Sequence, residues 1–200
     1  MAECAKCGRA NAEDAPSCVD CRWPFVLSAW QKSTHRIRRI TVDTGCVNAR
    51  QQNEHLNQLE RWAQEGRLRL ERSPALLQEL VGPARVRKAQ ELQPHLAVWV
   101  LDQSSLGVDT TLAGPDVHEE VRDVLFPTTS SLTSNQAADV AHLHSHVLTG
   151  ADAFVTLNPR DFILRGKQNS LQQLGIWVFT PKELVVLLKA LYGWSQSPSR

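Results

Sequence analysis

The chain has 200 residues, 42% of them hydrophobic, enough to bury one sizeable core plus a small appendage but not two full-sized domains. Its 22 Lys and Arg residues nearly balance 21 Asp and Glu residues, which gives a formal net charge of +1. This balance excludes a strong overall attraction to polyanions, so any contact with nucleic acid has to come from a local patch. No apolar segment reaches the ~18 to 20 residues that cross a bilayer, and the N-terminal stretch lacks a signal-like apolar region. We therefore expect a soluble, cytoplasmic protein without a membrane partner.

Four cysteines fall within the first 21 residues, as two C-x2-C pairs with ten residues between them. Two thiolate pairs at this spacing can close a tetrahedral four-sulfur site, which is typical of structural Zn²⁺. Disulfides and an iron–sulfur cluster are the alternatives, and a cytosolic setting disfavours the disulfides. The segment resembles bacterial zinc ribbons, and zinc binding would supply its folding energy. The expected zinc ligands are Cys4, Cys7, Cys18 and Cys21. The fifth cysteine, Cys46, is interpreted as a small buried residue.

Beyond residue 35, segments whose apolar residues repeat with the period of a strand alternate with segments whose apolar residues repeat with the period of a helix. In chain order, the expected elements are strand 36–43, helix 53–66, strand 67–71, helix 73–82, strand 96–101, helix 116–126, helix 134–148, strand 151–156, strand 174–180 and helix 180–191. Strands that alternate with helices favour a parallel sheet covered on both faces. The predicted fold class is therefore α/β, with three α/β/α layers around a parallel central sheet.

Acidic residues stand close to the carboxyl ends of the predicted strands. Asp43 closes the first strand, and Asp161 follows Thr156 by five residues. In open parallel sheets, ligands bind at the carboxyl ends of the strands. Two further acids, Glu79 and Asp139, lie beside the apolar stripes of predicted helices. These carboxylates are therefore candidates for one common site.

The acids belong to four short stretches: ITVDTGCVNA (40–49), SPALLQEL (73–80), NQAADVAHL (135–143) and ADAFVTLNPRDF (151–162). In order and spacing these stretches resemble the motifs of PIN-domain proteins, over about residues 36–190. Many PIN domains are metal-dependent ribonucleases, including toxins of bacterial toxin–antitoxin modules, with clustered acids that bind Mg²⁺ or Mn²⁺. The resemblance implies a catalytic centre made of Asp43, Glu79, Asp139, Asp161, Thr156 and Asn158.

The chemistry of the residues agrees with this implication. Converging carboxylates repel one another, and a divalent cation neutralises them. Hard oxygen ligands suit Mg²⁺ or Mn²⁺, and a metal-bound water can attack a phosphodiester. The four acids would hold the metal, and Thr156 and Asn158 would position water or phosphate. Ordinary structural alternatives are a turn cap at Asp43, a solvated helix residue at Glu79, and an Asx turn that joins Asn158 and Asp161.

Two positions depart from the family pattern. Gly45 stands where the family usually has an Asn after DT, and Asn158 stands where many active members have a fourth acid. The tract His142, His144 and His146 has the composition of a metal site, but alternate residues cannot share one helix face. The resemblance makes His142 a packing residue.

The sequence thus predicts a zinc ribbon at residues 1–30, a PIN-like nuclease domain at 31–192 and a mobile tail at 193–200. We expect a metal-dependent ribonuclease with an RNA substrate. A basic stripe of Arg36, Arg38 and Arg39 would bind nucleic acid, with a merely solvated face as the alternative. The alternative function is a catalytically silent PIN-like adaptor that binds RNA or protein. An antitoxin or other protein partner and a homodimer are left open.

Overall fold

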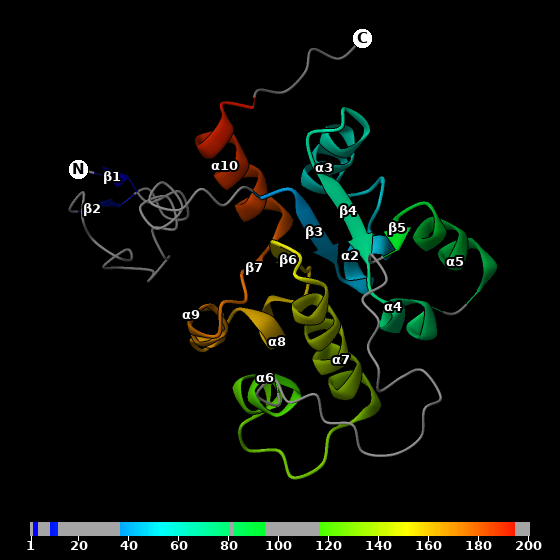
Figure 1. Ribbon diagram of the computed structural model, residues 1–200, viewed down its shortest axis with the longest axis vertical. Helices are drawn as coiled ribbons and strands as arrows, with labels where there is room; N and C mark the ends of the chain where they lie inside the picture. Colours follow the sequence, from blue (N-terminus) through cyan, green and yellow to red (C-terminus); the bar gives the residue numbers. More distant parts are fainter. Residues whose placement is uncertain (1, 4–8, 12–36, 81, 95–116, 195–200) are drawn as a thin grey trace.

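The computed structural model describes residues 2–3, 9–11, 37–80, 82–94 and 117–194 (Figure 1). Its main feature is a five-stranded sheet with the order β5-β4-β3-β6-β7, in which every neighbouring pair is parallel. The strands are β3 (Arg39–Val42), β4 (Arg69–Arg72), β5 (Gln93–Pro94), β6 (Ala153–Val155) and β7 (Val178–Phe179). The predicted α/β class with a parallel sheet is confirmed.

Helices fill the connections between the strands. They are α2 (Thr44–Asn48), α3 (Glu54–Gln64), α4 (Pro74–Glu79), α5 (Pro83–Gln90), α6 (Val117–Leu125), α7 (Ser134–Thr149), α8 (Pro159–Phe162), α9 (Lys167–Gln173) and α10 (Pro181–Tyr192). Their starts follow from capping chemistry. Asn53 Oδ1 accepts from two backbone N–H groups at the start of α3, and Thr133 and Thr180 each form a complete capping box.

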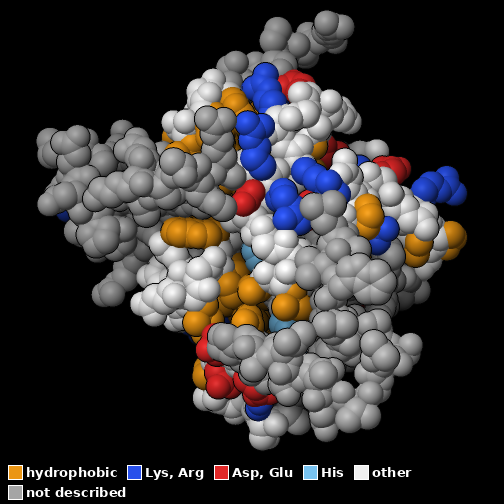
Figure 2. Space-filling view, viewed as in Figure 1, with side chains coloured by type: hydrophobic (Ala, Val, Ile, Leu, Met, Phe, Trp, Pro, Cys, Tyr) orange, Lys and Arg blue, Asp and Glu red, His pale blue; other side chains and the backbone are white. Residues whose placement is uncertain are grey.

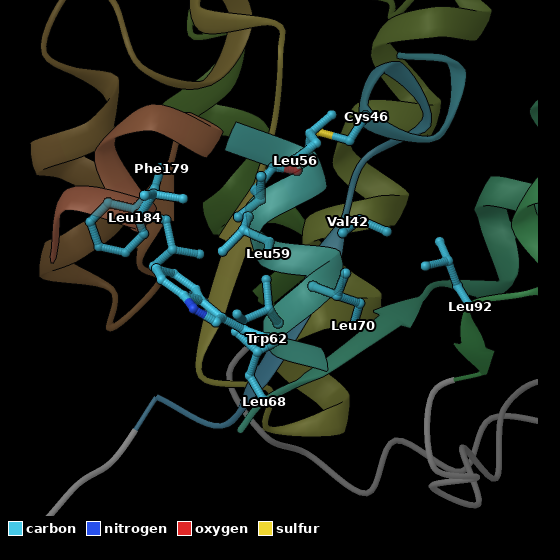
Figure 3. Packing of buried hydrophobic residues seen from close by; sticks show 14 of the residues in the cluster. Val42, Cys46, Leu56, Leu59, Trp62, Leu68, Leu70, Leu92, Phe179 and Leu184 are labelled. Atoms are coloured by element: carbon cyan, nitrogen blue, oxygen red, sulfur yellow. Dashed lines mark hydrogen bonds between the residues drawn. The ribbon is translucent and has the colours of Figure 1, made fainter. Parts of the chain in front are cut away.

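The sheet lies between two cores because successive strand residues point to opposite faces. On one face, Ile40 and Val42 of β3 join a cluster with residues of α3 and α10, among them the fully buried Trp62 (Figure 3). On the other face, Phe154 of β6 and Val178 of β7 pack with residues of α6, α7 and α9. Helices therefore cover both faces, as the sequence pattern predicted.

Several short elements differ from the prediction. The helix expected over 73–82 ends at Glu79, and Pro83 begins the separate α5 instead of marking a stop. Helices α2, α8 and α9 were not predicted, since elements of four to seven residues are too short to show an apolar period. The strand expected at 96–101 lies outside the described residues.

The N-terminal segment contributes one small element to the described part. Strand β1 (Ala2–Glu3) pairs antiparallel with β2 (Ala10–Asn11). Cys4, Cys7, Cys18 and Cys21 lie outside the described residues, as do the last six residues of the expected tail, so the zinc prediction stays a prediction. Cys46 is buried with a free thiol, as expected. Among the helices that the structure describes, none has the length and apolar character needed to span a bilayer.

Candidate functional site

The carboxyl ends of β3 and β6 bring together residues that are far apart in the sequence. Val42 pairs with Val155, so the next residues, Asp43 and Thr156, leave the sheet side by side. The Thr156 hydroxyl donates to Asp43 Oδ2 at 2.8 Å, and the Thr44 backbone N–H donates to Oδ1 at 2.7 Å. Burial raises the pKa of Asp43, although His142 and these two hydrogen bonds oppose the shift. Asp43 is thus both the cap of α2 and a buried acid at the sheet edge.

Glu79, the last residue of α4, is held by His142 of α7. His142 Nε2 lies 2.7 Å from Glu79 Oε2, and its Nδ1 lies 2.6 Å from the Ser73 hydroxyl. A carboxylate only accepts, so in a neutral imidazole Nε2–H donates to Glu79 and Ser73 donates to Nδ1. The Thr44 hydroxyl also donates to Glu79 Oε2. Burial alone would raise the pKa of Glu79, but the hydrogen bonds from His142 and Thr44 have the larger combined effect. The pKa of Glu79 is therefore lowered from its ordinary value.

His142 therefore corrects the interpretation drawn from the resemblance. It is fully buried, but both ring nitrogens make polar contacts, so it positions Glu79 and is more than a packing residue. His146 is also buried, with Nδ1 2.9 Å from the Thr41 hydroxyl, whereas the ring of His144 contacts that of His118. The three histidines do not form one site, which agrees with the expectation from helix geometry.

Asp139 lies on α7 one turn before His142 and faces the same region. Within the described part of the chain, its carboxylate makes no hydrogen bond or ion pair. Burial raises its pKa to about 7, and the charges of Asp43, Asp161 and Glu79 contribute to the rise while His142 opposes it. The charges of the other three predicted acids thus reach Asp139, whose carboxylate has no partner among the described residues.

The segment after β6 completes this edge. The Asn158 backbone N–H donates to the Thr156 hydroxyl at 2.9 Å, and its side-chain amide donates to Asp161 Oδ2 at 2.8 Å. Lys167 Nζ donates to the Asp161 backbone carbonyl at 3.1 Å. Asn158 therefore orients Asp161 through a bond between side chains, whereas the Asx turn that was the structural alternative is not formed, because the Asn158 side chain caps no backbone N–H of α8.

The donor set suits a hydrated cation better than one held by protein atoms alone. Among the described residues, no group of three or more His, Cys, Asp or Glu side chains is close enough to hold an ion together. Acceptor capacity nevertheless remains, because within the same residues Glu79 accepts only at Oε2 and Asp161 only at Oδ2. Mg²⁺ and Mn²⁺ keep several waters and bind proteins through few carboxylates. The chemistry of these acids fits such an ion.

Gly45 leaves room beside Asp43. A Cβ at this position would lie 3.4 Å from Asp43 Oδ2 and 3.7 Å from Leu157 Cβ, which are ordinary contact distances. A β-carbon would therefore be tolerated at this position.

The basic stripe lies at the other end of β3. Arg39 and Asp43 are four residues apart along an extended strand, about 13 Å. Arg39 makes two hydrogen bonds of 2.9 Å to the fully buried Glu71 and one of 2.8 Å to the Thr149 carbonyl. Arg69 Nε lies 3.0 Å from Glu71 Oε1, an ion pair without hydrogen-bond alignment.

This engagement gives Arg39 a structural role and disfavours its predicted contact with nucleic acid. Arg38 is exposed, and Arg36 lies outside the described residues. Figure 2 shows Lys and Arg side chains gathered over the part of the molecule where β3 and β4 lie in Figure 1. A contact of Arg38 with nucleic acid stays a prediction.

No protein-family model, curated protein or solved structure matches the chain. The likeness to PIN domains is therefore carried by the four sequence motifs, and it stays a prediction. Sequence reasoning missed Thr44, Ser73 and His142 as residues of the site. Ser73 was recognisable as a helix cap and His142 as a neighbour of Asp139 on one helix face, but their contact depends on how α4 packs against α7.

Asp139 gives the folded protein a testable pH dependence. Its folded pKa of about 7 lies above the ordinary value of 3.8, so folding favours the protonated acid. This contribution to stability is full below the unfolded pKa and is lost as the pH rises through the folded pKa. In protein dialysed free of Mg²⁺ and Mn²⁺, we predict that raising the pH from about 4 to about 7 lowers the Tm of the wild type by on the order of 5 °C more than that of Asp139→Asn. Asp123→Asn, on the exposed face of α6, is the control and should follow the wild type. Parallel pH profiles for the wild type and Asp139→Asn would contradict the prediction.

Proposed function

We propose that the chain is a metal-dependent nuclease of the PIN type that hydrolyses phosphodiester bonds in RNA, with Mg²⁺ or Mn²⁺ as cofactor. The observation that carries this proposal is the convergence of acids on Asp139, whose pKa rises to about 7 under burial and the charges of its neighbours. Unpaired like charges destabilise a fold, and strongly perturbed acids in such arrangements are typical of functional sites. The four sequence motifs support the same assignment.

Each side chain then has a distinct task. Asp43, Glu79, Asp139 and Asp161 would hold the ion, which when bound supplies a Lewis acid and lowers the pKa of a coordinated water. Thr156 donates to Asp43 and accepts from the Asn158 backbone, so it fixes the orientation of the first acid. Asn158 does the same for Asp161. His142, itself hydrogen-bonded to Ser73, keeps Glu79 turned toward Thr44.

A structural zinc on Cys4, Cys7, Cys18 and Cys21 completes the proposal, with the ribbon contacting substrate or a partner. The cysteine spacing supports it, as does the antiparallel pairing of β1 with β2, because Cys4 and Cys7 lie in the connection between these strands. The proposal also includes a cytoplasmic location and leaves room for an antitoxin partner and a homodimer. None of them is needed for the chemistry of the site.

A catalytically silent adaptor is the second candidate, and two observations favour it. Within the described residues no three ligand side chains are assembled around one point, and Asn158 replaces an acid. An adaptor would bind RNA or protein without cutting it. Cleavage assays separate the two candidates directly.

The nuclease proposal predicts Mn²⁺-dependent cleavage of labelled RNA by the purified full chain. Asp43→Asn and Asp139→Asn should each lower the cleavage rate by at least ~100-fold, because each removes a charge from the ion site. Asp123→Asn should cut like the wild type, and a single-stranded DNA of the same sequence tests the choice of substrate. Cleavage that persists in EDTA and in Asp43→Asn would point to a contaminating nuclease. RNA binding without cleavage would favour the adaptor.

The zinc proposal predicts about one zinc per chain in the purified protein, measured by elemental analysis. Cys18→Ser should lose this zinc, because three thiolates no longer close the tetrahedral site. The α/β part has its own core, so its Tm should be unchanged in the variant. A wild type that contains iron, or no metal at all, would contradict the proposal.

A further inference from the structure

Positive charge gathers beside the acidic site, on the segment from α8 to α9. Arg160 lies on α8, Arg165 in the following turn, and Lys167 is the first residue of α9. The carboxylates of Asp161 and Asp139 and the guanidiniums of both arginines act electrostatically on the Lys167 ammonium. These three basic residues are called the basic rim below. Lys167 thus lies beside two of the acids, and Arg160 and Arg165 lie within electrostatic range of Lys167, so the three charges border the acidic site.

The basic rim keeps its charge available to an anion. Among the residues that the structure describes, no ion pair joins Arg160, Arg165 or Lys167 to a carboxylate within salt-bridge distance. Lys167 is held by neutral groups instead: its Nζ donates to the Asp161 carbonyl at 3.1 Å and lies 5.1 Å from the centroid of the Phe126 ring. Arg160 and Arg165 are exposed. This differs from the amino end of the sheet, where the Arg39 guanidinium is bound to Glu71.

The backbone at Arg165 adds a second observation. Arg165 has φ of 59° and is followed by Gly166 at 81°, so two successive residues adopt the left-handed conformation. For a residue with a side chain this conformation costs on the order of 1 kcal/mol, and glycine avoids the cost. Strain of this kind at the border of a site suggests that the side chain is retained for a reason other than stability.

We propose that the basic rim binds the sugar–phosphate backbone of single-stranded RNA and guides it across the acidic site. This inference rests on the proposed function, because it assumes that the acids act on the strand that the basic rim holds. A cluster of carboxylates repels a polyanion, and adjacent cations offset that repulsion locally. Contacts to phosphate position a strand without reading its sequence, so binding through the basic rim is independent of sequence.

The chain offers matched variants for the test. Arg165→Gly removes one charge and also relieves the left-handed strain, so it should weaken RNA binding while the Tm stays equal or rises. Arg160→Gln and Lys167→Gln remove the other two charges. Arg61→Gln removes an exposed arginine in the last turn of α3, at the end that leads into β4 and the amino edge of the sheet, and serves as the control.

The affinity for a labelled single-stranded RNA is measured by fluorescence anisotropy with the full chain. The buffer contains no Mg²⁺ or Mn²⁺, so that the strand is not cut. Each rim variant should weaken binding about three- to tenfold and lower the slope of log Kd against log salt by ~0.7 per lost phosphate contact. Arg61→Gln should bind like the wild type. Equal binding of single-stranded DNA supports contacts to the phosphate backbone, whereas binding of DNA alone overturns RNA as the ligand.

Three results overturn the inference: no RNA binding by the wild type, wild-type affinity in all three rim variants, or an equal loss in Arg61→Gln. Failure of the proposed function gives a different pattern. If the rim variants lose affinity but the wild type never cuts RNA with Mn²⁺, the basic rim stands and the nuclease proposal fails. If the wild type cuts and the rim variants bind and cut equally well, the nuclease proposal stands and the basic rim fails.

Discussion

Repulsion between carboxylates is the constraint on which the rest of this structure depends. Asp43, Glu79, Asp139 and Asp161 come from four separate segments, and the burial and mutual proximity of these acids raise the pKa of Asp139 to about 7. Such an arrangement does not stabilise a fold, so the stability has to come from the two apolar cores on either face of the sheet. The rigid parallel sheet then serves as the frame that holds mutually repelling groups in place.

The acids at the two ends of the sheet have different kinds of partner. At the amino end, Glu71 is neutralised by direct contact with Arg39 and Arg69. At the carboxyl end, three of the donors to the acids are neutral, the hydroxyls of Thr44 and Thr156 and the Asn158 amide, and the fourth is the His142 ring. Neutral donors fix a carboxylate without cancelling its charge. The first end neutralises its buried acid, and the second holds its acids without a cationic partner such as Arg39, which is what the proposed cation site requires.

Much of this could be anticipated from the sequence. The main strands and long helices were predictable because apolar periodicity and caps such as Asn53, Thr133 and Thr180 are local signals. Asp43 and Asp161 were expected at the site because strand ends mark the ligand-binding edge of a parallel sheet. Glu79 and Asp139 were expected there from their places beside apolar helix stripes and from the motif resemblance. The short helices and the contact of His142 with Glu79 were not, since they depend on packing between distant segments. The position of Arg39 was predictable, but its partner Glu71, on the neighbouring strand, was not.

The most direct measurement of the central claim is the binding of Mn²⁺ to the zinc-loaded, full-length protein, followed by the loss of the free-ion signal in electron paramagnetic resonance. If the acids share one cation site, the wild type takes up Mn²⁺ and Asp139→Asn binds it at least ~10-fold more weakly. Competition by Mg²⁺ should release the bound Mn²⁺, because both ions take the same hard oxygen ligands. A wild type that leaves Mn²⁺ free, or an Asp139→Asn variant that binds it equally well, would contradict the claim that these carboxylates act together.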